Sequence, residues 1–104
     1  MARETAFQFL LERDVAVRVR FTRNRGRITA FVVQLECWIR DHWYPVMRYD
    51  TAHGFTHCDA LKPDGTQEKH TIPIRDFNEA LTYAQNDLRT NYRRYCERFK
   101  EQLK

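Results

Sequence analysis

The chain opens with segments in which hydrophobic and polar residues alternate, the two-residue period of a strand with one buried face. The clearest segment is 15–22, where valine or phenylalanine fills every odd position, and 28–39 continues the same period. Between them, Arg23-Asn-Arg-Gly-Arg27 is rich in turn residues. We predict a β-hairpin with both apolar sets on one face. The pairs expected are Val19 with Phe31 and Val17 with Val33.

Further strands are expected on both sides of this hairpin. Residues 6–12 fit the spacing of either a strand or a helix, and we favour a strand. Residues 44–50, 55–61 and 67–72 are predicted as three more strands, separated by turns at Thr51–Gly54 and Pro63–Gly65. Pro45 lacks a backbone donor and is expected at a strand start or on a bulge.

The C-terminal part of the chain has the spacing of a helix. Asp76 followed by Glu79 is a capping-box pattern, after which apolar residues recur every three or four positions. One amphipathic helix of about 25 residues is therefore expected. The apolar positions are Phe77, Ala80, Leu81, Ala84, Leu88, Tyr92, Tyr95 and Phe99. The fold class predicted is α+β, a single domain over residues 1–104 with an antiparallel meander of four to six strands and the helix packed on one face.

Composition narrows the class of protein. No apolar run approaches the roughly 20 residues of a membrane-spanning helix, and the start lacks the pattern of a secretory signal, so a cytoplasmic protein is expected. The 13% aromatic content argues against intrinsic disorder. Cys37, Cys58 and Cys96 have no zinc or redox spacing, and we expect reduced, packed thiols.

The positive charge of the chain is concentrated in one segment. The whole sequence carries +4, whereas residues 13–27 hold six arginines and one acid, a balance of +5 that leaves −1 elsewhere. Arginines suit phosphate, so nucleic-acid binding is one interpretation, and a solvated turn is the other. The candidate nucleic-acid-binding residues are Arg18, Arg20, Arg23, Arg25 and Arg27.

Alternation also places many charged residues on the sheet face away from the helix. With Glu36 across from Arg48, Gln34 meets Asp50, and the next turns bring His57 across from Arg48 and Asp59 across from Lys69. The residues expected on this face are Arg18, Arg20, Glu36, Arg48, Asp50, His57, Asp59 and Lys69. Glu36 and Asp59 are interpreted as members of structural ion pairs, which alone would suit a wet sheet face.

The same residues could cleave RNA without a metal. His57 would be the general base or acid and His53 the second proton-transfer group. Lys69 and Arg48 would stabilise phosphate charge, with Asp50 and Glu36 orienting the cations.

A metal site is the alternative for the histidines and aspartates of this segment. Asp50, His53, His57 and Asp59 are competent ligands, but His-x-x-x-His is a helical zinc spacing and here crosses the turn at Gly54. We therefore expect no metal site and no cofactor.

Several motifs carry a resemblance to known families. Arg48-Tyr-Asp-Thr-Ala-His-Gly54 followed by His57-x-Asp59 resembles, in motif order, a family of small uncharacterised prokaryotic proteins. The Arg-Tyr-Asp and His-rich turn is also similar to TumE-like toxins of toxin–antitoxin pairs, although Cys58 and Asp59 follow His57 here. Supporting motifs are Val33–Glu36, Trp43–Val46, Pro63–Gly65, Glu68-Lys69, Ala80–Ala84, Asp87-Leu88 and Asn91.

The resemblance implies a prokaryotic, cytoplasmic, toxin-like protein acting on RNA, and the residues above suggest a metal-independent endoribonuclease. The alternative is a non-catalytic protein-interaction module or the partner subunit of a toxin–antitoxin-like pair. RNA and an antitoxin-like protein are thus the two partners expected.

Overall fold

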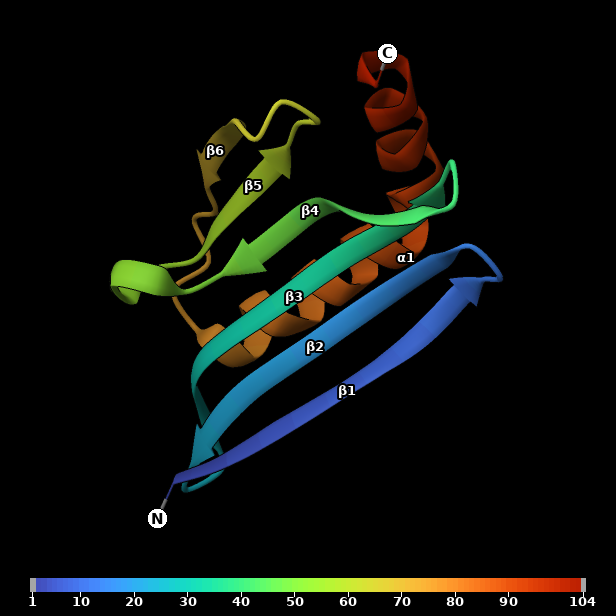
Figure 1. The fold of residues 1–104 in the computed structure, drawn as a ribbon. Helices are drawn as coiled ribbons and strands as arrows, with labels where there is room; N and C mark the ends of the chain where they lie inside the picture. Colours follow the sequence, from blue (N-terminus) through green and yellow to red (C-terminus); the bar gives the residue numbers. More distant parts are fainter. Residues whose placement is uncertain (1, 104) are drawn as a thin grey trace.

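The structure is a computed structural model that describes residues 2–103. Six strands form one antiparallel sheet in chain order, and one long helix covers one of its faces, running behind β3 in Figure 1. A short 3-10 turn, η1 (Ala52–Gly54), joins β4 to β5. The elements are β1 (Ala2–Glu12), β2 (Val15–Asn24), β3 (Arg27–Ile39), β4 (His42–Asp50), β5 (His57–Leu61), β6 (Gln67–Thr71) and α1 (Phe77–Gln102). The predicted α+β class is confirmed.

The predicted burial of the odd-numbered positions is also confirmed. Val17, Val33 and Leu35 are fully buried beneath α1, which contributes Ala84 and Leu88 to the same core. The opening segment is a strand, as favoured, and it starts earlier than expected because β1 pairs with β2 along its whole length.

The β2–β3 hairpin pairs different residues from those predicted. Val19 lies opposite Val33 and Val17 opposite Leu35. The turn contains only Arg25 and Gly26, both with positive φ, and a bulge lies between Thr22 and Arg23. Together these shift the partner by two positions, which leaves every side chain on its predicted face.

The next two registers also differ from the prediction. A bulge beside Pro45 places Gln34 opposite Arg48, so the predicted pairing of Glu36 with Arg48 is wrong. The β4–β5 connection spans residues 51–56 and is longer than the predicted turn at Thr51–Gly54. It places His57 opposite Asp50, so the expected pairing of His57 with Arg48 is wrong too. The bulge expected of Pro45 is confirmed, as is Asp59 opposite Lys69.

The start of α1 is capped by Asp76. Its carboxylate accepts a hydrogen bond from the backbone N–H of Asn78 at 2.9 Å. The predicted capping box would have used the N–H of Glu79, one residue later. The side chain of Asn78 in turn accepts from the N–H of Ile28 on β3 at 2.9 Å. The cap therefore also fixes the helix start against the sheet.

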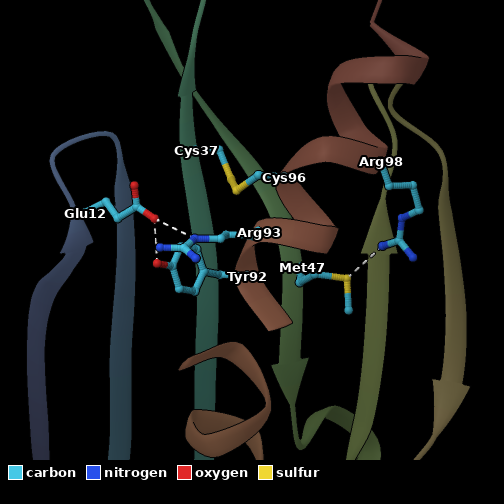
Figure 2. Close-up of a disulfide and its surroundings, with 7 residues drawn as sticks. All are labelled: Glu12, Cys37, Met47, Tyr92, Arg93, Cys96 and Arg98. Carbon is cyan, nitrogen blue, oxygen red and sulfur yellow. Dashed lines mark hydrogen bonds and ion pairs between the residues drawn. A yellow bond between two sulfur atoms is a disulfide. The ribbon is translucent and has the colours of Figure 1, made fainter. Parts of the chain in front are cut away.

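Two of the three cysteines form a disulfide, which corrects the expectation of reduced thiols. Cys37 of β3 and Cys96 of α1 face each other across the layer between sheet and helix, with Cα atoms 6.2 Å apart (Figure 2). This Cα separation is typical of a disulfide. The pair is separated by 59 residues in the chain, so no local spacing signalled it. Cys58 is free and buried, as expected.

Two polar contacts tie α1 to β1. The Tyr92 hydroxyl donates to Glu12 Oε2 at 2.6 Å, and Arg93 Nε donates to the same oxygen at 3.1 Å (Figure 2). The hydrogen bond from Tyr92, and then that from Arg93, lower the pKa of the Glu12 carboxyl.

A second polar network ties α1 to β4. Asp87 accepts from the Tyr49 hydroxyl at 2.6 Å and from the Tyr95 hydroxyl at 2.8 Å. Asn91 donates to the same carboxylate at 2.7 Å. Burial and then the bond to Asp87 raise the pKa of Tyr95 to about 12, and the same two causes raise the pKa of Tyr49. Both hydroxyls therefore stay protonated and donating at neutral pH.

Candidate functional site

The sheet face opposite α1, called the open face here, carries the predicted polar residues. At its centre His57 lies between two carboxylates: Nε2 is 2.7 Å from Asp50 Oδ1, and Nδ1 is 3.6 Å from Asp59 Oδ1. Lys69 Nζ lies 3.8 Å from the same Asp59 oxygen. His57 is only 2% exposed and Asp59 3%. Four predicted site residues thus meet, in a cluster that is largely closed to solvent.

Arg48 is held outside this cluster by a hydrogen-bonded chain. Its Nε donates to Gln34 Oε1 at 2.9 Å, and Gln34 Nε2 donates to Glu36 Oε2 at 2.7 Å. Glu36 also pairs with Arg18 Nη1 at 3.5 Å. The predicted Glu36–Arg48 ion pair is replaced by this chain because Gln34, not Glu36, lies opposite Arg48.

His53 does not join the predicted catalytic group. It lies exposed on η1 with a φ of 68°, and within residues 2–103 no hydrogen bond or ion pair connects its side chain to His57. The wide turn that sets His57 opposite Asp50 includes η1, so His53 lies outside the strand pairing of β4 and β5. The geometry therefore offers no second proton-transfer histidine beside His57.

A groove of about 470 Å³ runs across the open face beside the cluster. It connects the outer strands to the end of β4, where Asp50 forms part of its wall. Its polar lining includes Glu4, Arg20, Thr22, Asp50 and Thr51. Of Asp50, His57 and Asp59, Asp50 is therefore the one that solvent reaches most directly, with 15% of its side chain exposed.

The arginines of the β2–β3 segment fall into two groups. Arg18 pairs with Glu36, and Arg20 Nε lies 3.9 Å from Glu4. At the end of the hairpin, by contrast, four exposed arginines gather, and no ion pair joins any of them to an acid in the described part of the chain. We call this group the basic hairpin end: Arg3, Arg23, Arg25 and Arg27.

Arg3 was missed by the sequence reasoning because the first strand was expected to begin later. It lies directly opposite Arg23 across β1 and β2. Like charges at opposite strand positions repel, which makes this a costly place for two arginines unless an anion lies nearby. Arg3 thus adds to the positive charge of the hairpin end.

Comparison with known families gives a match over the whole length of the given sequence. A family model described as "Domain of unknown function (DUF7718)" matches residues 1–104. The chain belongs to the DUF7718 family. No curated protein and no solved structure matches it. Across the described residues of this DUF7718 member, no helix is long and apolar enough to cross a membrane.

The free thiol of Cys58 should be unreactive in the folded protein. Burial raises the pKa of the Cys58 thiol to about 12, whereas an exposed thiol has a pKa of about 8.5. Since the thiolate is the reactive form, iodoacetamide at mildly alkaline pH should leave native Cys58 unmodified and modify it in concentrated guanidinium chloride. Intact-mass analysis measures the difference. Rapid modification of the native protein would mean that Cys58 is exposed to solvent.

Proposed function

We propose that this chain is an RNA-binding protein of toxin-like character, with the basic hairpin end as its phosphate-binding surface. The observation that carries the proposal is the contrast between the two groups of arginines. Arg18 and Arg20 lie beside acids, whereas the four arginines of the basic hairpin end have no such partner within residues 2–103. Unpaired guanidinium groups are free to bind phosphate oxygens in a bidentate manner.

The fold gives these arginines a defined spacing. Arg3, Arg23 and Arg27 are held by strand pairing, and Arg25 lies in the two-residue turn. An RNA strand that crosses the end of the hairpin would meet three neighbouring chain segments at once. Binding would then release several counterions and depend strongly on salt.

Cleavage of RNA is not part of this proposal. His57 exposes 2% of its side chain and is enclosed by Asp50 and Asp59, so a phosphate has little access to it. The similarity of Arg48–Gly54 to the corresponding segment of TumE-like toxins supports RNA as the partner. It does not require this chain to share a histidine-based mechanism, because the histidines are fewer here.

The proposed setting is the prokaryotic cytoplasm, which the same resemblance implies. The disulfide between Cys37 and Cys96 argues against it, because such bonds are rare in the cytoplasm of mesophiles. Alkylating the free thiols in acid-quenched cells would show whether Cys37 and Cys96 are oxidised or reduced inside the cell. A single labelled cysteine would indicate an oxidised pair in the cell, and three would indicate a reduced one.

Replacing Arg23, Arg25 and Arg27 together with glutamine should weaken binding to single-stranded RNA and flatten its salt dependence. Loss of three phosphate contacts should reduce the slope of log K against log salt by about 2, at about 0.7 per contact. Fluorescence anisotropy with a labelled RNA over a series of salt concentrations measures this slope.

The matched control replaces Arg18, Arg20 and Arg48 with glutamine, which removes the same charge from the open face. We expect this control to keep most of the wild-type slope. Equal losses in the two triple variants would mean that net charge alone attracts RNA. No measurable binding by the wild-type protein would refute the proposal.

A second candidate is protein binding at the free edge of β1. This strand forms one edge of the sheet, and Phe7 and Leu10 are 45% and 63% exposed. Edge strands readily pair with a strand from another chain. The product of a neighbouring reading frame, produced together with this chain, should copurify with it and be lost from a Phe7→Ser, Leu10→Ser variant. Retention by that variant would exclude this edge.

A further inference from the structure

We propose that Asp50, His57 and Asp59 form a binding site for a divalent transition-metal ion. The inference is independent of RNA binding. It departs from the sequence expectation of no metal, which weighed these three residues together with His53 and was decided by the spacing of the two histidines across the turn. The three residues come from the end of β4 and from alternate positions on β5, so two adjacent strands hold all of them.

The distances within the cluster suit a shared ion. One nitrogen of His57 and one oxygen of each aspartate lie within 4.8 Å of one another. Metal–ligand bonds of about 2.0–2.2 Å to nitrogen and oxygen place neighbouring ligand atoms about 3–4 Å apart. Small side-chain rotations would therefore bring the three ligand atoms around one ion, with water completing its coordination.

The hydrogen-bonding state of these buried atoms is the second observation. Three of these atoms, His57 Nδ1, His57 Nε2 and Asp59 Oδ1, have no hydrogen-bond partner among residues 2–103, although the two side chains are only 2% and 4% exposed. The short approach of His57 Nε2 to Asp50 lacks the geometry of a hydrogen bond. Buried polar atoms almost always have a partner, and an ion in the cluster would supply one to Asp59 Oδ1 and to one of the two ring nitrogens of His57.

The charge balance points the same way. Two carboxylates lie beside His57, and in the described part of the chain no lysine or arginine forms an ion pair with Asp50, while Asp59 has Lys69 at 3.8 Å, about half exposed. The nearest arginine on the face, Arg48, directs its Nε to Gln34 instead. A divalent ion would neutralise the two carboxylates where the surrounding side chains do not.

The ligand types favour transition metals over calcium or magnesium. Imidazole suits zinc, cobalt, iron and nickel, whereas calcium and magnesium prefer oxygen ligands alone. Asp50 also forms part of the wall of the groove on the open face, which gives an ion a route to the cluster.

Titration with Co²⁺ or Zn²⁺ alone tests the site. Protein without an affinity tag, treated with chelator and dialysed, should bind one ion per chain. Calorimetry measures this binding, and for Co²⁺ the visible absorption bands of the bound ion report it as well. Asp50→Asn, which is nearly isosteric and changes the most exposed ligand, and His57→Gln should each weaken binding about 10-fold or more.

His70→Gln is the matched control, because His70 is an exposed histidine on β6 whose side chain pairs with Glu68, outside the proposed site. It should bind the ion as the wild-type protein does. If His57→Gln fails to fold, Asp50→Asn decides the result, with circular dichroism showing that it is folded. Absence of binding, binding lost equally in His70→Gln, or undiminished binding by Asp50→Asn would overturn the proposal and leave His57 as a buried neighbour of two carboxylates.

Discussion

Replacing Cys37 and Cys96 together with alanine should lower the free energy of unfolding by about 4 kcal/mol. Their disulfide closes a loop in which the two cysteines are separated by 59 residues, and it joins the central strand β3 to the last third of α1. In the unfolded chain the bond restricts this long loop, which is the main source of the expected stabilisation. Guanidinium denaturation under non-reducing conditions, followed by circular dichroism, measures the effect.

Cys58→Ala is the control for loss of a buried sulfur without loss of a bond. It should cost about 1–2 kcal/mol at most, because only a small side chain is trimmed. Adding dithiothreitol to the wild-type protein should destabilise it to the level of the double variant. A double variant as stable as the wild-type protein, or three free thiols in the oxidised, unfolded wild-type protein, would contradict the presence of the disulfide.

Replacing Asp87 with alanine should lower the free energy of unfolding by about 3 kcal/mol. Its carboxylate accepts hydrogen bonds from Tyr49 and Tyr95, whose rings lie largely in the core between α1 and the sheet. Without Asp87 both hydroxyls would remain buried with an acceptor missing. Urea denaturation monitored by tyrosine fluorescence measures this loss.

Asp87→Asn and Glu97→Ala separate the causes. Asparagine keeps one acceptor oxygen and should recover part of the stability, whereas Glu97 is an exposed acid on the same helix and its loss should be nearly neutral. Because burial and Asp87 raise the pKa of Tyr95 to about 12, this stabilisation is present below the unfolded tyrosine pKa of about 10 and is lost as the pH rises towards 12. A loss in Asp87→Ala no larger than in Glu97→Ala would contradict the role of this network.

The fold was predictable because the period of two is a strong signal. Odd positions of β2 and β3 were assigned to the core, and that assignment holds even where the pairing is wrong. The errors in register are all two residues, which preserves the face of every side chain. They arise at the Arg25-Gly26 turn, beside Pro45 and in the β4–β5 connection, where the number of residues in a turn or bulge depends on backbone geometry that alternation does not encode.

The candidate site was predictable in its membership and less so in its environment. Asp50, His57 and Asp59 were expected on one face and are found in one cluster. Their burial was not expected, because alternation assigns polar residues of a one-sided sheet to solvent. The hydrogen bond from Arg48 to Gln34 was not expected either, because the predicted register placed Gln34 opposite Asp50. The bulge beside Pro45 places it opposite Arg48 instead.

Long-range contacts were the least predictable. The disulfide joins residues far apart in the chain, and the Asp87 network depends on the rotation of α1 above β4. The contribution of Arg3 to the basic hairpin end depended on where β1 begins. RNA as the partner remains a prediction that the arrangement of these arginines supports.

Titration of ¹⁵N-labelled protein with a short single-stranded RNA, observed by two-dimensional NMR, tests the central claim most directly, since a chain of 104 residues gives resolved spectra. The proposal predicts that the amides perturbed are those of the basic hairpin end, around Arg3 and residues 23–27, while those around His57 on β5 change little. Perturbation centred on the cluster of Asp50, His57 and Asp59, or no perturbation at low salt, would contradict it.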